Sequence, residues 1–204
     1  PRHGFSLLEL LIVLTILLVI SGSIFQVISL SMQRSSAEQT KLDMFQSARE
    51  FMDQMSRDLR QAGYPSARNF TTGSLTTPFA NDSKVAVGLV TVDADELWFE
   101  GDVDGAGTVS VIHYYLDPST TNNCPCLKRS QLPKVTGDPL TAQTAASYQV
   151  EVQGVTNTDI FSARSSGTTV TFSSGSGLPV TFSASSGMTI ASIDTVQATL
   201  SLQG

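Results

Sequence analysis

The first part of the chain is continuously apolar. Residues 5–30 read FSLLELLIVLTILLVISGSIFQVISL, and no charged residue lies between Leu10 and Gln33. About 20 apolar residues, at a rise of 1.5 Å each, cross the hydrocarbon core of a membrane, which is about 30 Å thick. The pattern therefore predicts a membrane-spanning helix. Arg2, with His3, lies just before it and favours a cytoplasmic N-terminus.

In residues 34–62 the pattern changes: apolar residues recur with the spacing of a helix, and charged residues lie between them. Their apolar residues are three or four apart: Leu42, Phe45, Ala48, Met52, Met55, Leu59 and Ala62. Five basic and five acidic residues in this segment cancel. Gly63 and Pro65 are typical of the end of a helix. We therefore predict one helix over residues 5–62. Its first half requires lipid or other helices, and its second half requires a sheet.

The pattern after Phe70 is that of short strands and turns, rich in Thr, Ser, Gly, Val and aromatic residues. Alternation of Val109, Val111, His113 and Tyr115 predicts the buried face of an antiparallel sheet lying on the helical stripe, hence an α+β fold. The Ser- and Gly-rich run 162–187 is expected to be a surface excursion. Strands are expected at 85–92, 96–100, 108–116, 148–152, 168–173, 180–183 and 194–202, and turns at 101–107, 117–123 and 174–179.

Composition and charge narrow the class of protein. The chain has 204 residues, of which 41% are apolar and 15% charged, which argues for one folded domain and against disorder. The formal net charge is −6, and the whole surplus lies in residues 63–204. An acidic balance disfavours both a nucleic-acid binder and a protein held to anionic lipid by charge.

Glu9 is the exception within the apolar run, four residues from its start. A carboxylate in hydrocarbon costs a few kcal/mol on insertion scales and needs a partner. A secretory signal peptide cleaved near Ser21-Gly22-Ser23, or a plain membrane anchor, fits the length and the flanks of the run. Neither explains Glu9, and the helical pattern continues past residue 23.

Gly4-Phe5-Ser6-Leu7-Leu8-Glu9, followed by the apolar helix, resembles the processing motif of type IV prepilins and of the pseudopilins of type II secretion. The resemblance implies a pilin-like fold and a prepilin peptidase that cuts between Gly4 and Phe5 and N-methylates Phe5. It also implies two kinds of partner, namely other pilin subunits and an inner-membrane assembly platform. Glu9 would neutralise the Phe5 amine of a neighbouring subunit displaced by about 6 Å along the helix axis.

The resemblance divides the chain into a leader (1–4), a membrane and filament-core half-helix (5–33), an amphipathic half-helix (34–63) and a β-rich head (64–204). Residues 55–65, MSRDLRQAGYP, are similar to the helix end of PilW-like minor pilins and, less closely, of J-type minor pseudopilins. Major type IVa pilins usually carry a proline in the first half of the helix, and none lies between Phe5 and Ala62. These features favour a minor pilin that initiates or tips a type IV pilus.

Three alternatives stay open: a minor pseudopilin of a type II secretion system, a major filament subunit with an elaborated head, and a single-pass anchored binding protein. In the pilin interpretations the precursor lies in the inner membrane and the mature protein in an extracellular filament or a periplasmic pseudopilus.

The remaining candidate residues predict little chemistry. Cys124 and Cys126 are the only cysteines, and their number and compartment favour a disulfide over a metal or redox site. Asp102 and Asp104 match the first ligand positions of a calcium-binding loop, but the later ligands of such a loop are missing. The segment is therefore expected to be a turn. His113 is expected to be structural. No nucleophile elbow or phosphate loop is present, so we expect neither catalysis nor a metal or cofactor.

Overall fold

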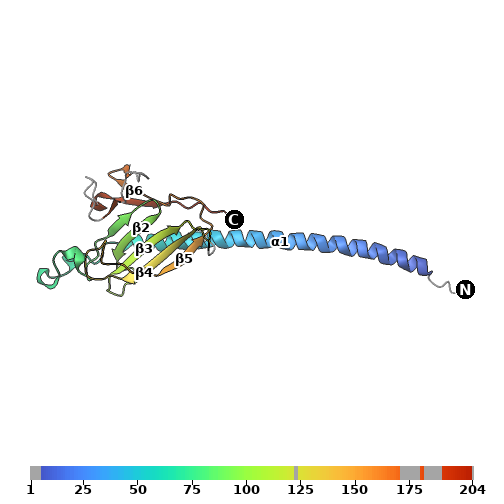
Figure 1. The fold of residues 1–204 in the computed structure, drawn as a ribbon, viewed down its shortest axis with the longest axis horizontal. Helices are drawn as coiled ribbons and strands as arrows, with labels where there is room; N and C mark the ends of the chain where they lie inside the picture. The colour runs from blue at the N-terminus through green and yellow to red at the C-terminus, as the bar shows by residue number, and fades with distance from the viewer. Residues whose placement is uncertain (1–5, 122–123, 171–179, 182–189, 204) are drawn as a thin grey trace. The chain divides into compact units, whose positions relative to one another are not determined.

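The computed structural model describes residues 6–121, 124–170, 180–181 and 190–203. One helix, α1 (Leu7–Arg60), runs without a break through Ser21-Gly22-Ser23. The chain divides into two compact units, residues 1–43 and residues 44–203, so α1 contributes to both. Figure 1 shows α1 and the strands of the second unit.

The second unit holds two antiparallel sheets, which confirms the predicted α+β, pilin-like fold. The larger sheet has the order β5-β4-β3-β2-β1-β8, and the smaller one the order β7-β6-β9. The strands are β1 (Leu89–Val92), β2 (Glu96–Gly101), β3 (Ser110–Asp117), β4 (Cys126–Pro133), β5 (Tyr148–Gln153), β6 (Phe161–Ser165), β7 (Thr168–Val170), β8 (Val180–Thr181) and β9 (Thr195–Ala198). Four short 3-10 helices, at Ala67–Asn69, Thr72–Ser74, Phe79–Asn81 and Ile190–Ser192, complete the described elements.

The end of α1 is tied closely to β2. Gly63 follows the helix with a positive φ of 81°, a conformation that favours glycine, and its N–H donates to the carbonyl oxygen of Glu100 at 2.9 Å. Ala62 and Gly101 form an isolated antiparallel bridge. A Cβ on Gly101 would overlap the carbonyl oxygen of Gln61, so this close approach requires glycine.

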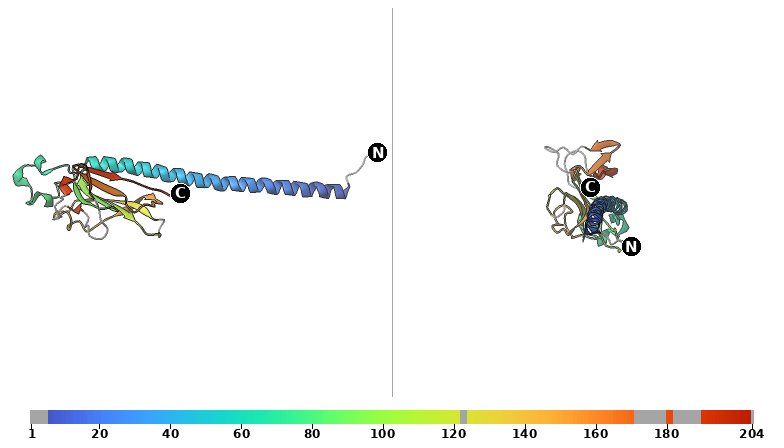
Figure 2. Two further views of the ribbon diagram at one scale, coloured as in Figure 1. Left: turned by 90° about the horizontal axis from the view of Figure 1, so that it is seen from above. Right: turned by 90° about the vertical axis from the view of Figure 1, so that its right-hand side faces the viewer.

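The core lies between the second half of α1 and one face of the larger sheet, and Figure 2 shows this helix and sheet from two further directions. Phe51 and Tyr114 meet edge to face with ring centroids 5.3 Å apart. Phe51 is buried although the predicted stripe left it out, whereas Phe45 of that stripe is 60% exposed. The rest of the stripe is confirmed from Ala48 onward, because Met55 is buried and Ala48, Met52, Leu59 and Ala62 pack against the core.

Of the alternating set predicted to be buried, Val109 and Val111 are at most 5% exposed, but the face of β3 that contributes to the core is the other one. Ile112, Tyr114 and Leu116 face the core and are all at most 4% exposed, whereas His113 and Tyr115 lie on the opposite face and are partly exposed. The residues of β3 that face the core and those that face away from it are both apolar or aromatic. The second set is partly covered too, by residues 143–146. Alternation alone gave no means of choosing between them.

Several strand boundaries also differ from the prediction. The predicted strand 85–92 starts only at Leu89, because Gly88 adopts a φ of 85°. β4 and β6 were missed. Most of β6 and all of β7 lie in the run 162–187, which was expected to be a surface excursion, and β6 pairs with β7 and with β9. The turn predicted at 174–179 lies outside the described residues.

Asp58, buried at 1% exposure, joins α1 to two strands of the sheet. Its Oδ2 accepts hydrogen bonds from the Tyr114 hydroxyl at 2.7 Å and from Arg129 Nη2 at 2.8 Å. Gln54 donates to the other oxygen at 2.6 Å. Burial and the charge of Asp58 raise the pKa of Tyr114, so its hydroxyl keeps the proton that it donates. Burial lowers the pKa of Arg129, but the charge of Asp58 and the hydrogen bonds to Asp58 and Tyr114 together raise this pKa overall.

We expect Asp58→Ala to lower the free energy of unfolding by about 3–5 kcal/mol, because it leaves the Arg129 cation, whose side chain is only 15% exposed, without its partner. Asp53→Ala, on the exposed side of the same helix, is the matched control and should change the stability by about 0.5 kcal/mol or less. Denaturant unfolding of the full chain in detergent, followed by the fluorescence of Trp98, measures both. Equal midpoints for the two variants would contradict the structural role of Asp58.

Candidate functional site

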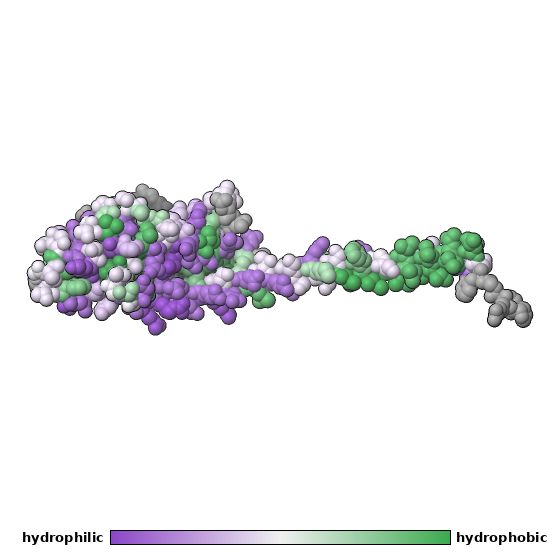
Figure 3. Space-filling model, turned by 90° about the horizontal axis from the view of Figure 1, so that it is seen from below, coloured by the Kyte–Doolittle hydropathy of each residue, from purple (hydrophilic) through white to green (hydrophobic). Residues whose placement is uncertain are grey.

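The apolar half of α1 has no cover within its own unit. Its large apolar residues between Leu7 and Leu30 are between 46% and 82% exposed. Figure 3 shows them as a continuous apolar surface on the side in view. By length and composition, α1 is able to cross a membrane. A helix that is apolar all round requires lipid or other helices around it.

Glu9 lies in the first turn of α1, where Ser6 begins the helical hydrogen bonds. The amides of Glu9 and Leu10 donate to the carbonyl oxygen of Ser6 at 3.0 and 3.2 Å. A carboxylate in the first turn interacts favourably with the helix dipole, but only by about 0.3–1 kcal/mol. The Glu9 side chain is exposed, and it has no ion pair among the residues that the structure describes. Gly4 and Phe5 lie outside those residues.

Residues 1–25 match the family model for the prokaryotic N-terminal methylation motif. This supports a type IV pilin-like or pseudopilin-like subunit. Such a signal implies processing by a prepilin peptidase and a membrane-anchored helix, consistent with a precursor held in the inner membrane. The motif is a feature of structural subunits rather than of enzymes. Neither the curated proteins nor the solved structures that were compared with the chain gave a match.

Cys124 and Cys126 are bonded to each other in the structure, with Cα atoms 4.4 Å apart. Their sulfurs and a carboxylate oxygen of Asp117 lie within 4.8 Å of one another. These atoms are already engaged, since Asp117 pairs with Lys128 at 2.5 Å and accepts a hydrogen bond from the Ser119 amide at 2.9 Å. The geometry therefore favours the disulfide over a metal site at this cluster.

The acidic segment after β2, residues 102–107, is held by hydrogen bonds between its own residues. Asp102 Oδ2 accepts a hydrogen bond from the Gly107 amide, and Asp104 Oδ1 accepts one from the Ala106 amide, each at 3.0 Å. Glu100, the first acid of the predicted loop, pairs with Lys134 at 2.7 Å. This geometry favours the turn over the calcium loop that was its alternative.

Sequence reasoning missed the Glu100–Lys134 pair, in which both side chains are at most 2% exposed. Lys134 also donates to the carbonyl oxygens of Ala80 and Val85, each at 2.7 Å. Burial raises the pKa of Glu100, although the hydrogen bond from Lys134 opposes that effect. The partners are 34 residues apart, so no local pattern marks them.

The Lys128 ammonium and the Ser119 amide lower the pKa of Asp117 from 3.8 to about 2. A depressed folded-state pKa contributes stability that is present above pH 4 and is lost as the pH falls towards 2. We expect wild type to be more stable than Asp117→Asn at pH 5, and the difference to vanish near pH 2. Urea unfolding across this range measures it.

Lys128→Met is the matched control, because it removes the other partner of the same pair. It should lose most of the same pH-dependent stability. A difference between wild type and Asp117→Asn that stays constant from pH 5 to pH 2 would contradict the electrostatic origin.

Proposed function

We propose that the chain is a structural subunit of a type IV pilus, and specifically a minor pilin that initiates or tips the filament. The N-terminal methylation motif, followed by an apolar half-helix that carries one carboxylate, is the observation on which the proposal rests. In this account residues 1–4 are removed, and residues 5–33 pass from lipid into a bundle of helices. Residues 34–63 and the head, residues 64–204, move with them.

Glu9 supplies the register of that bundle. Cleavage before Phe5 creates a cationic amine at the end of an apolar helix, where an unpaired charge is costly to bury. The carboxylate of a neighbouring subunit neutralises it if the two helices are displaced by about 6 Å. Desolvation offsets much of the attraction, so the pair acts mainly by penalising every arrangement that leaves one partner unpaired.

The apolar half-helix suits transfer between lipid and protein in part because two of its hydroxyl groups are satisfied within the helix. Thr15 donates to the carbonyl oxygen of Ile12, and Ser23 to that of Ile20, each at 2.8 Å. α1 continues through Gly22 without the proline typical of major type IVa pilins. This difference supports the minor over the major role.

The second unit offers a further apolar surface for a neighbouring subunit. A groove of about 440 Å³ lies between α1 and the C-terminal segment, lined by Phe45, Ala48, Met52, Leu200 and Leu202 together with Arg49 and Asp53. Phe45 is 60% exposed at this groove. Apolar side chains of an adjacent subunit would cover it in the filament.

A disulfide between Cys124 and Cys126 belongs to the same proposal, because the head is exported to an oxidising compartment. Intact mass spectrometry without reductant should find the protein two hydrogens lighter than after reduction. Equal masses would show that the thiols are free.

We expect Glu9→Ala to be cleaved and methylated normally but to enter filaments at about one hundredth of the wild-type level, because an unpaired buried charge costs about 3 kcal/mol or more. Immunoblots of sheared filaments and of membranes measure the two steps separately. Glu38→Ala is the control, since Glu38 is an exposed acid of α1 beyond the apolar half, and it should assemble normally. Normal incorporation of Glu9→Ala would contradict the role of Glu9.

Copy number distinguishes the minor pilin from its alternatives. Quantitative mass spectrometry of purified pili should find this chain far below the most abundant subunit. Abundance equal to the main subunit would make it a major pilin. Loss of protein secretion, with pili intact, in a deletion strain would make it a pseudopilin of type II secretion.

A further inference from the structure

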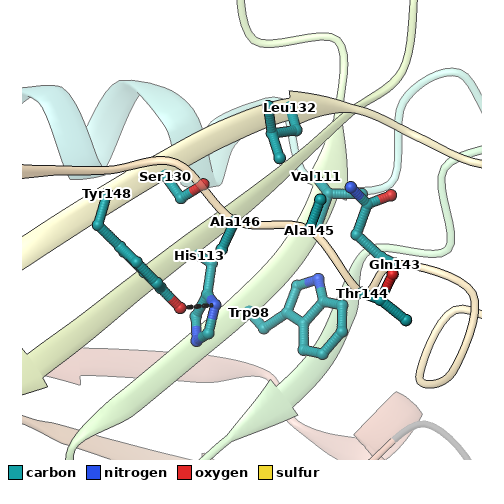
Figure 4. Close-up of a pocket in the computed structure, with 10 residues that line it drawn as sticks. All are labelled: Trp98, Val111, His113, Ser130, Leu132, Gln143, Thr144, Ala145, Ala146 and Tyr148. Carbon is teal, nitrogen blue, oxygen red and sulfur yellow. Dashed lines mark hydrogen bonds between the residues drawn. The ribbon is translucent and has the colours of Figure 1, made fainter.

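Four side chains form a row across the face of the larger sheet that lies away from α1. Trp98 on β2 is in register with His113 on β3, His113 with Ser130 on β4, and Ser130 with Tyr148 on β5. The ring of His113 stacks on Trp98 with centroids 5.5 Å apart and meets Tyr148 edge to face at 5.3 Å. Figure 4 shows Trp98, His113 and Tyr148 grouped along one side of a pocket.

Residues 143–146 pass over this row and leave a cavity of about 150 Å³ beneath them. The segment is held in place on both sides, because the Ser147 amide donates to Ser130 Oγ at 2.9 Å and the Val135 amide donates to Gln143 Oε1 at 3.2 Å. Val111 and Leu132 add apolar walls. The cavity therefore combines aromatic and aliphatic walls with a few polar atoms, which is typical of a small-molecule site.

The indole N–H of Trp98 is an unmatched donor of this cavity, and His113 Nε2 is the other lining atom without a hydrogen bond among the described residues. Trp98 Nε1 is buried and has no hydrogen-bond acceptor among the described residues. Leaving such a donor unpaired costs about 1–3 kcal/mol, so the site favours a ligand that brings an acceptor.

His113, in contrast, is committed to its neighbours. Its Nδ1 lies 2.6 Å from the Tyr148 hydroxyl. Its Nε2 lies 2.7 Å from Glu96 Oε1, although outside the alignment of a hydrogen bond. Burial and the charge of Glu96 raise the pKa of Tyr148 to about 12, so its hydroxyl stays protonated. These contacts hold the wall of the cavity in place and leave the indole N–H for a ligand.

The size of the cavity limits what it can hold. Sites for drug-sized ligands have volumes of roughly 300–1,000 Å³, whereas a cavity of about 150 Å³ accommodates a group of a few heavy atoms. An acetamido group matches in both size and chemistry. Its carbonyl oxygen can accept a hydrogen bond from Trp98 Nε1, and its methyl group can pack against Val111 and Leu132.

The mouth of the cavity indicates what carries that group. Tyr148 is 39% exposed beside it, so the exposed part of its ring can contact a sugar ring. Residues 63–204 carry twelve acidic and six basic residues, which disfavours an acidic sugar. We propose that the cavity binds the acetamido group of a neutral N-acetylated amino sugar.

Trp98 is the only tryptophan of the chain and reports directly on its own site. The full chain is kept in micelles of a zwitterionic detergent that has no sugar head group. Titration with N-acetylglucosamine should then give a saturable change of Trp98 fluorescence, with a dissociation constant of about 1 mM. Glucose and glucosamine lack the acetamido group and should bind at least tenfold more weakly. N-acetylneuraminic acid, which carries both the group and a carboxylate, should also bind more weakly.

Two variants test the geometry by ligand-observed NMR. Trp98→Phe keeps an aromatic ring but removes the N–H, and it should weaken binding at least tenfold. Ala145→Leu fills the cavity from the covering segment without altering the sheet, and it should abolish binding. Ala106→Leu, in an exposed turn, is the matched control and should bind as wild type does.

The proposal is overturned if N-acetylglucosamine gives no saturable change, if glucose binds equally well, or if Ala145→Leu binds as wild type does. Tighter binding of N-acetyl-lysine than of the sugar would overturn the sugar assignment in favour of a peptide. None of these measurements depends on Glu9 or on filament assembly, so the proposed function stands or fails separately.

Discussion

The apolar half of α1 is a surface that its own unit does not cover. Its side chains from Leu7 to Leu30 are exposed along the helix, and no charge other than Glu9 interrupts them. Water is therefore an unfavourable environment for this half, and lipid or a bundle of helices is a favourable one. Lipid satisfies the helix but not the carboxylate, whereas a bundle with a displaced neighbour satisfies both. In our proposal, that difference gives the transfer from membrane to filament its direction.

The second half of α1, unlike the first, is covered by the chain's own sheet. Phe51 and Met55 are buried on the sheet, as an amphipathic helix requires, but the centre of that face also holds the carboxylate of Asp58. Its charge is matched by Arg129 and its oxygens by Tyr114 and Gln54. One helix thus carries two acids in apolar surroundings. One is paired within the chain, and in our account the other is paired between subunits.

Much of this architecture was accessible from the sequence, because the signals were long or local. The uninterrupted apolar run and the helical period predicted α1 to within two residues of each end. The phase of β3 and the whole of β4 were not accessible. β4 reads CLKRSQLP, and its two central cations are paired with Asp117 and Asp58, which lie 11 and 71 residues away along the chain. The cavity beside Trp98 was equally invisible, because four strands and a covering segment together create it.

The most direct measurement of the central claim is the mass of the N-terminal peptide of the mature protein, purified from cells that make it. The account predicts a peptide that begins at Phe5 and carries one added methyl group on its amine. A mature protein that retains Gly4, or that begins after Ser23, would have no methylated amine for Glu9 to neutralise and would contradict the account.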